Sequence, residues 1–311
     1  MKAGTTARHA ARAWKPKARA RCPSPGSSRT RARLMILDFD GSILDSLHAK
    51  QERCFMPEFV RSFGEGAEKE PLEELWRYVS LDSRHRGVNR FRALAVALRI
   101  GSRLPQIGPL LRRHSGLADA LDAWLAHEPS PSAGRLASAL AGKAVDRKLA
   151  RVLAWSRDVD RAIDLLPPAA TFVGAGRILS QGATDAEIRL LSSSTSARAR
   201  RELAGAGLSA FTDALLAQER GEKARCVALA MEARFDPAAV LVIGDAPVDL
   251  AAARSVGASF YPIVPGREEE SWRSFERDFL PDFLMGRPTH APLGPFLDAF
   301  ATGLPSQFHA G

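Results

Sequence analysis

Two carboxylates that stand two residues apart follow an apolar run near the start of the chain. Residues 34–37 are all apolar, and Asp38, Asp40 and Gly41 come after them. Such a run is typical of a buried strand in a parallel sheet, and the carboxyl end of that strand is where open α/β sheets bind ligands. Side chains alternate along an extended chain, so Asp38 and Asp40 point the same way and repel unless a cation lies between them. A hard ion such as Mg²⁺ suits these oxygens, whereas the structural alternative is an Asp-rich turn.

Three later segments also place polar side chains where a predicted strand ends or a helix begins. They are Ser192 and Ser193 after the strand 187–191, Lys223 at the start of the helix 223–234, and Asp245 and Asp249 after the strand 239–243. Together with the first pair they suit phosphoryl transfer through an aspartyl-phosphate. A carboxylate attacks phosphorus, Mg²⁺ bridges it to the phosphate, and a hydroxyl and an ammonium hold the oxygens.

Three of these residues also have a structural interpretation. Ser192 and Asp249 are suited to capping helix N-termini, and a lysine at the start of a helix, such as Lys223, is typically solvated. Asp245 follows five apolar residues and a glycine, which leaves it without such an explanation.

With the four segments in this order, the sequence resembles the haloacid dehalogenase-like superfamily of hydrolases from about Leu34 to Gly266. The matching motifs are Asp38-Phe39-Asp40-Gly41-Ser42, Leu190-Leu191-Ser192, Lys223, and Gly244-Asp245-Ala246-Pro247-Val248-Asp249. The resemblance implies that Asp38 is the nucleophile and that Asp40 is the general acid and then the base. It further implies that Ser192 binds the phosphate, with Ser193 beside the substrate, and that Lys223 pairs with the phosphate and Asp38. The implied metal ligands are Asp38, the backbone carbonyl of Asp40, Asp245 and, directly or through water, Asp249.

Two details of the first motif refine this expectation. Family members that cleave carbon–halogen bonds lack the second acid, which is present here as Asp40, so dehalogenase chemistry is not expected. Ser42 replaces the usual Thr or Val of the family, a change without consequence for the reaction.

The order of elements predicts an α/β fold with a three-layer, Rossmann-like parallel sheet and an inserted all-α cap. Residues 34–46 and 166–285 form the α/β core, residues 47–165 the cap, and residues 286–311 a C-terminal tail. Expected cap helices cover 47–63, 71–79, 88–100, 117–127 and 143–166. Core helices are expected over 197–206, 223–234 and 249–256, strands over 187–191, 239–243 and 259–264, a weak strand or connector over 211–217, and a solvated helix over 267–277.

The segment 82–90 is the densest polar cluster of the predicted cap. It contains Arg84, Arg86 and Arg90 at a loop and helix start, and we expect one of these to contact an anionic substrate. The alternative for each arginine is a solvated cap surface.

Residues 1–33 differ in composition from the rest of the chain. They carry ten basic residues and no acid, whereas the remaining chain has a net charge of −1. The segment is predicted to be disordered, and it is interpreted as an arm for an anionic surface or nucleic acid, a transit-like peptide, or sequence upstream of a true start at Met35. Nucleic-acid binding is not expected outside this segment.

Composition limits the remaining possibilities. The hydrophobic content of 45% is typical of a globular protein, and no apolar run approaches 18 residues, so we expect no membrane partner. Three cysteines without a metal-binding spacing favour a reducing compartment, here taken as cytoplasmic.

The sequence thus predicts a Mg²⁺-dependent phosphomonoester hydrolase for a small phosphorylated metabolite. Two alternatives stay open: a phosphomutase, which passes the same phosphoryl group to a sugar hydroxyl, and a non-catalytic binding domain. Neither the substrate nor the oligomeric state follows from the sequence.

Overall fold

The computed structural model describes residues 32–66, 69–141, 146–182 and 185–301. The prediction of disorder for residues 1–33 therefore lies almost entirely outside the described residues. Arg33 is described, and it belongs to the fold: its carbonyl accepts a hydrogen bond from the Glu187 amide at 2.8 Å, and its guanidinium donates to the Ala238 carbonyl at 3.1 Å.

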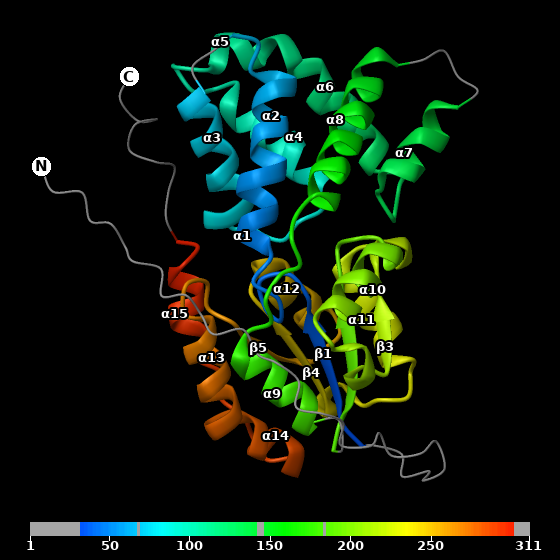
Figure 1. Ribbon diagram of the computed structural model, residues 1–311, viewed down its shortest axis with the longest axis vertical. Coiled ribbons are helices and arrows are strands. Elements are labelled where there is room, and N and C mark those ends of the chain that lie inside the picture. Colours follow the sequence, from blue (N-terminus) through cyan, green and yellow to red (C-terminus); the bar gives the residue numbers. More distant parts are fainter. Residues whose placement is uncertain (1–31, 67–68, 142–145, 183–184, 302–311) are drawn as a thin grey trace, which may run out of the picture.

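A five-stranded sheet forms the centre of the lower half of the molecule (Figure 1). Its strands are β1 (Leu34–Asp38), β2 (Glu187–Leu191), β3 (Ala214–Leu216), β4 (Val240–Gly244) and β5 (Ser259–Pro262). They pair in the order β3-β2-β1-β4-β5, and every pairing is parallel. The predicted strands over 187–191, 239–243 and 259–264 are confirmed within two residues, and the weak strand is shorter than expected.

Alternate residues of the strands pack into two separate apolar layers. On β1, Met35 and Leu37 face the layer of α9 (Val173–Gly182), α10 (Ser196–Gly205), α13 (Glu268–Ser274) and α14 (Leu280–Met285). Leu34 and Ile36 face α11 (Lys223–Met231), α12 (Pro247–Ser255) and α15 (Leu293–Asp298). A strand buried on both faces must be apolar throughout, so the run 34–37 is continuous. The prediction of a three-layer α/β fold is confirmed.

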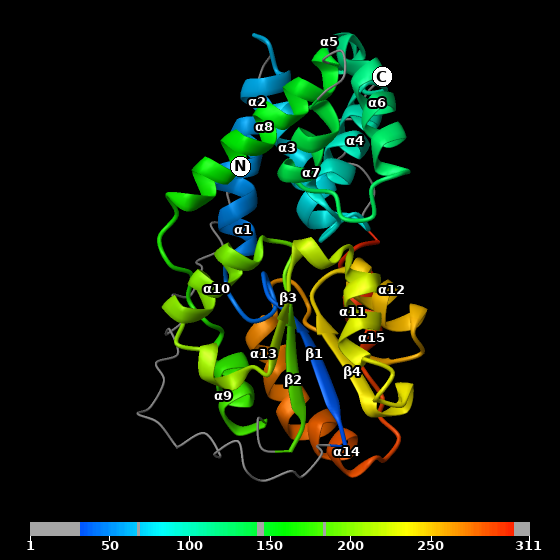
Figure 2. The ribbon, with the colours of Figure 1, turned by 90° about the vertical axis from the view of Figure 1, so that its right-hand side faces the viewer.

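The helices between β1 and α9 lie above the carboxyl ends of the strands (Figure 2). They pack around an apolar core of their own, which is separate from the two layers on the sheet. They are α1 (Leu47–Lys50), α2 (Met56–Phe63), α3 (Lys69–Arg77), α4 (Arg90–Gly101), α5 (Gly108–Leu111), α6 (Ser115–Leu125), α7 (Ala133–Leu140) and α8 (Arg147–Asp164). π-Helical turns over Gln51–Phe55 and Tyr78–Asp82 join α1 to α2 and extend α3. We call this layer the cap. All five expected cap helices are present, whereas α5 and α7 were not predicted.

Aromatic side chains fill the centre of the cap. Trp76 lies 4.9 Å from Phe59 and 5.8 Å from Trp155 between ring centroids, and Phe63 lies 5.6 Å from Phe59. Because these rings come from α2, α3 and α8, the insert has a core of its own.

Three expectations for the α/β core need correction. Helix α9 was not predicted, because Gly174 and Gly176 lower its intrinsic helix propensity. The helix over 267–277 is not simply solvated, since Trp272 and Phe275 are fully buried. Residues 286–311 are not all tail: Phe296 of α15 is fully buried against Phe260 of β5.

Candidate active site

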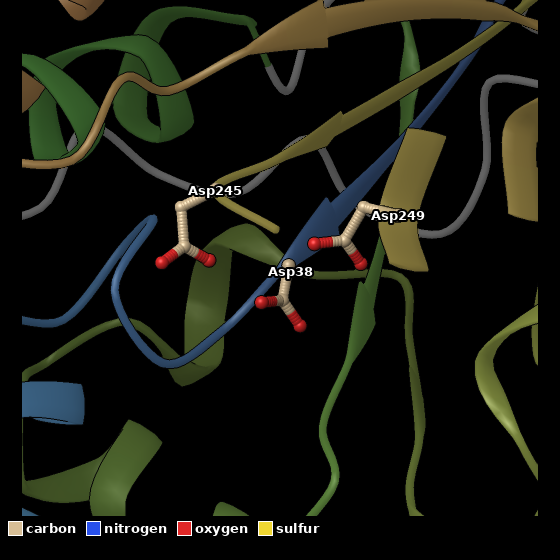
Figure 3. A group of neighbouring side chains, drawn as sticks. All are labelled: Asp38, Asp245 and Asp249. Atoms are coloured by element: carbon tan, nitrogen blue, oxygen red, sulfur yellow. The ribbon is translucent and has the colours of Figure 1, made fainter. Parts of the chain in front are cut away.

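Three carboxylates converge at the carboxyl end of the two central strands (Figure 3). Asp38 ends β1, Asp245 follows the neighbouring strand β4, and Asp249 lies in the first turn of α12. One oxygen from each lies within 4.8 Å of the others, and the three residues are 5%, 1% and 0% exposed. The structure therefore brings together the strand-end acids that the sequence singled out.

Lys223 lies between two of these carboxylates. Its ammonium nitrogen is 2.9 Å from Oδ1 of Asp38 and 2.7 Å from Oδ1 of Asp249. Burial opposes its charge, but the neighbouring carboxylates dominate and raise the pKa of Lys223. Lys223 is thus a fixed, buried cation and not a solvated helix-start lysine.

Two acids of the cluster, Asp38 and Asp249, have raised pKa values. Burial and the charge of Asp249 raise the pKa of Asp38 well above its ordinary value, although Lys223 opposes this. Burial likewise raises the pKa of Asp249, whose Oδ2 accepts a hydrogen bond from the Ala246 amide at 3.2 Å. The structural interpretation of Asp249 as an N-cap residue is wrong, because α12 begins at Pro247 after the N-cap Ala246; Asp249 is the third helical residue, binds back to the Ala246 amide and also faces the site. A further positive charge would stabilise this cluster.

A tight turn carries the chain from β1 past Asp245. Gly41 has a φ of +86°, and a Cβ built on it would lie 2.9 Å from Cγ of Asp245. The turn therefore needs a left-handed residue without a side chain. It is closed by hydrogen bonds between the Gly41 amide and the Leu44 carbonyl and between the Leu44 amide and the Phe39 carbonyl.

Asp40 points away from the three-carboxylate cluster toward the cap helix α1. Its Oδ1 lies 2.6 Å from Nζ of Lys50 and also accepts a hydrogen bond from the Ser46 hydroxyl. Lys50 is in turn 2.8 Å from Glu202 of α10. Burial would raise the pKa of Asp40, but Lys50 outweighs it and holds that pKa below its usual value. Asp40 is thus kept as an oriented carboxylate.

Arg86 of the cap reaches the core carboxylate Asp245. Its Nε lies 3.0 Å from Oδ2 of Asp245, and its Nη1 donates to the Leu81 carbonyl at 3.2 Å. Both side chains are 1% exposed. This ion pair is therefore buried at the junction of cap and core.

A cavity of about 90 Å³ lies over Asp38 between cap and core. Its polar lining includes Asp38, Asp40, Lys50, Gln51, His85, Asn89, Arg90, Ser193, Ser194, Gln218, Lys223 and Asp245. Phe55, Trp76, Val88 and Ile163 give it an apolar side. The strand ends thus line the cavity with charged and polar groups, whereas the cap contributes both polar and apolar side chains.

The remaining predicted residues divide between this cavity and other places. Ser193 lines it, whereas Ser192 lines a neighbouring cavity and its hydroxyl accepts a hydrogen bond from the Ser194 amide at 3.1 Å. Arg90 lines the cavity but is paired with Asp160 at 2.9 Å. Arg84 is exposed and outside the cavity lining. The predicted roles of these residues stay predictions.

Several cavity residues gave no signal in the sequence. Lys50, Gln51 and Phe55 lie on cap segments whose pattern is that of an ordinary amphipathic helix. His85 and Asn89 lie in the polar segment 82–90 that was singled out for its arginines. Only that segment offered a clue to where the cap meets the core.

The carboxylate donors fit a hard divalent ion. Asp38, Asp245 and Asp249 offer oxygen ligands only, which is the set that Mg²⁺ prefers. Burial, together with the charge of neighbouring carboxylates, raises the pKa values of Asp38 and Asp249. The side chain of Asp40 is not part of this group, so its predicted contribution is limited to its backbone carbonyl.

No family model matches the chain, and no curated protein is similar enough to count as a match. Many similar solved structures are of haloacid dehalogenase-like hydrolases, the superfamily that the four motifs resemble. One is a haloacid dehalogenase-like hydrolase from Streptococcus pneumoniae, with 15% identity, a TM-score of 0.43, and coverage of 80% of this chain and 93% of the other. Another is a predicted phosphoglycolate phosphatase from Haemophilus somnus, with 12% identity, a TM-score of 0.44, and coverage of 75% and 86%. At these values we base the function on the site alone.

None of the described helices is long and apolar enough to cross a membrane.

Proposed function

We propose that this protein is a Mg²⁺-dependent phosphomonoester hydrolase that acts on a small phosphorylated metabolite through a phosphoryl-aspartate at Asp38. One observation carries the proposal: the ammonium of Lys223 bridges Asp38 and Asp249 at 2.9 and 2.7 Å, with Asp245 alongside. A buried acid cluster with a fixed cation is costly to fold, and it suits a reaction that moves a charged phosphoryl group.

Asp38 is the nucleophile in this proposal. It ends the central strand β1, and it lines the cavity where a phosphoryl group would lie. Its carboxylate oxygen attacks phosphorus, and the bond from phosphorus to the leaving oxygen breaks. The ammonium of Lys223 keeps Asp38 ionised and oriented and attracts the phosphoryl oxygens.

Asp40 transfers the protons. It lines the same cavity, and Lys50 and Ser46 fix its orientation. The protonated form of Asp40 gives its proton to the leaving oxygen, and the carboxylate that results then accepts a proton from the water that attacks the phosphoryl-aspartate. Lys50 favours the carboxylate form that this second step needs.

Asp38, Asp245 and the Asp40 carbonyl would hold Mg²⁺, with Asp249 directly or through water. The ion would supply positive charge that screens the phosphate from these acids.

The cavity of about 90 Å³ restricts the substrate under the closed cap. Phe55, Trp76 and Val88 would contact an apolar part of a ligand bound there. These features support a small metabolite and disfavour a protein substrate.

Hydrolysis of p-nitrophenyl phosphate with and without Mg²⁺ tests the proposal. We expect metal-dependent turnover that falls at least about a thousandfold in Asp38→Asn, because no carboxylate nucleophile remains. Asp119→Asn, which changes an exposed carboxylate of the cap, is the matched control and should retain turnover. Equal turnover in Asp38→Asn and the parent protein would refute the assignment.

A further inference from the structure

Arg86 places a cap-borne positive charge on a carboxylate that the proposed function assigns to the metal. Its Nε is 3.0 Å from Oδ2 of Asp245, and both side chains are 1% exposed. A guanidinium rarely loses its proton, so this charge is permanent. Asp245 thus has a counter-ion that the protein itself supplies.

Two protein cations face the three acids. Lys223 pairs with Asp38 and Asp249, and Arg86 pairs with Asp245. A divalent ion held by Asp38 and Asp245 would therefore lie beside a buried guanidinium. Like charges repel strongly where water is excluded, so the pair and the ion oppose one another.

The loop that carries Arg86 is seated directly on the core. Gly87 has a φ of +75°, and a Cβ built on it would lie 2.6 Å from Cβ of Ala246 and 3.0 Å from Cγ1 of Val248. The Arg86 amide donates to the Ser83 carbonyl at 2.9 Å, which closes the loop on itself. The backbone that carries Arg86 is thus closed on itself and packed against the core beside Asp245.

We propose that Arg86 and the divalent metal ion are alternative partners of Asp245, so that metal binding releases the cap loop 83–87 from the core. In the metal-free protein the arginine stabilises the closed cap and protects the acids. In the metal-bound protein the loop is free to move, and substrate enters. This inference rests on the proposed function, because it takes Asp245 as a metal ligand.

Mn²⁺ affinity of the full-length protein, measured by electron paramagnetic resonance, tests the exchange. We expect Arg86→Met to bind Mn²⁺ roughly tenfold more tightly than the parent protein, since no arginine must be displaced. Arg84→Met removes an exposed arginine from the same loop and should leave the affinity unchanged. Equal or weaker binding by Arg86→Met overturns the exchange while leaving the proposed function intact. If neither the parent protein nor Arg86→Met binds Mn²⁺, both proposals fail.

Hydrogen exchange on the parent protein tests the same idea without a variant. We expect Mg²⁺ to speed amide exchange over residues 83–88 while slowing it around Asp245. Unchanged or slower exchange over 83–88 with Mg²⁺ bound would overturn the release of the loop, even if Arg86→Met fails to fold.

Discussion

The ammonium nitrogen of Lys50 lies 2.6 Å from Oδ1 of Asp40 and joins the first cap helix to the turn that follows β1. The same ammonium is 2.8 Å from Oε1 of Glu202 on the core helix α10. Lys50 is only 5% exposed, so its ammonium is buried at the junction of cap and core between two half-buried carboxylates. Because Asp40 has no partner of opposite charge among the other ion pairs of the described residues, its orientation depends on Lys50.

Replacing Lys50 with methionine should therefore impair proton transfer by Asp40. We expect kcat to fall about 10-fold to 100-fold on an alkyl phosphate, whose leaving oxygen needs a proton, and less on p-nitrophenyl phosphate. Lys69→Met, at an exposed position of α3, serves as the control. Equal losses of kcat on the two substrates would mean that the substitution lowers activity only by destabilising the folded protein.

Gly87 lets the backbone of the cap lie directly against Ala246 and Val248 of the core. Gly87→Ala adds a Cβ that would lie 2.6 Å from Ala246, so we expect a clear loss of activity as well as a destabilisation of about 1 kcal/mol from the left-handed backbone. Gly66→Ala is a matched control, because Gly66 has a φ of +82° and nothing within 4 Å of its Cβ. Chemical denaturation should show a stability loss for both variants that is larger for Gly87→Ala because of its added contact, and turnover should show an activity loss for Gly87→Ala alone. Unimpaired activity in Gly87→Ala would contradict the observed seating of the loop.

His114 makes the stability of the cap depend on pH. Burial against Phe63, and then the charge of Arg151, lower the pKa of His114 below its ordinary value of 6.5, while Glu65 opposes this and Arg113 adds to it. The folded protein thus binds this proton less well than the unfolded chain does. The contribution of neutral His114 is present above pH 6.5 and is lost as the pH falls through 6.5 toward the lower folded-state pKa.

Urea denaturation between pH 7.5 and about 5.5 measures this effect. The parent protein should lose on the order of 1 kcal/mol more than His114→Leu over this range. His127→Leu, at an exposed position after α6, should keep the pH dependence of the parent protein. An unchanged pH dependence in His114→Leu would show that the histidine is not the group responsible.

Local sequence was enough to predict the parts of the site that lie on single strands. Asp38 and Asp245 each follow an uninterrupted apolar run, and a central parallel strand produces that pattern wherever it occurs. The carboxyl ends of parallel strands lie at the same edge of a sheet. The sequence therefore predicts that Asp38 and Asp245 lie close together, even though it does not give the strand order.

The contacts made across the junction of cap and core could not be predicted in this way. Lys50 and Arg86 act through Asp40 and Asp245, and only the packing of the cap on the core brings these pairs together. Helix α9 escaped detection for a related reason: Gly174 weakens it locally, while packing of Ile178 and Leu179 on the sheet stabilises it.

The central claim is that the phosphoryl group passes through Asp38, and trapping that intermediate tests it most directly. Asp40→Asn retains the nucleophile but lacks the base that activates water, so label from ³²P-p-nitrophenyl phosphate, whose leaving oxygen needs little protonation, should accumulate on the peptide containing Asp38 when turnover with Mg²⁺ is quenched in acid. Asp38→Asn,Asp40→Asn should carry no label. Label on another residue, or turnover by the parent protein with no label on Asp38 in Asp40→Asn, would contradict the proposed mechanism.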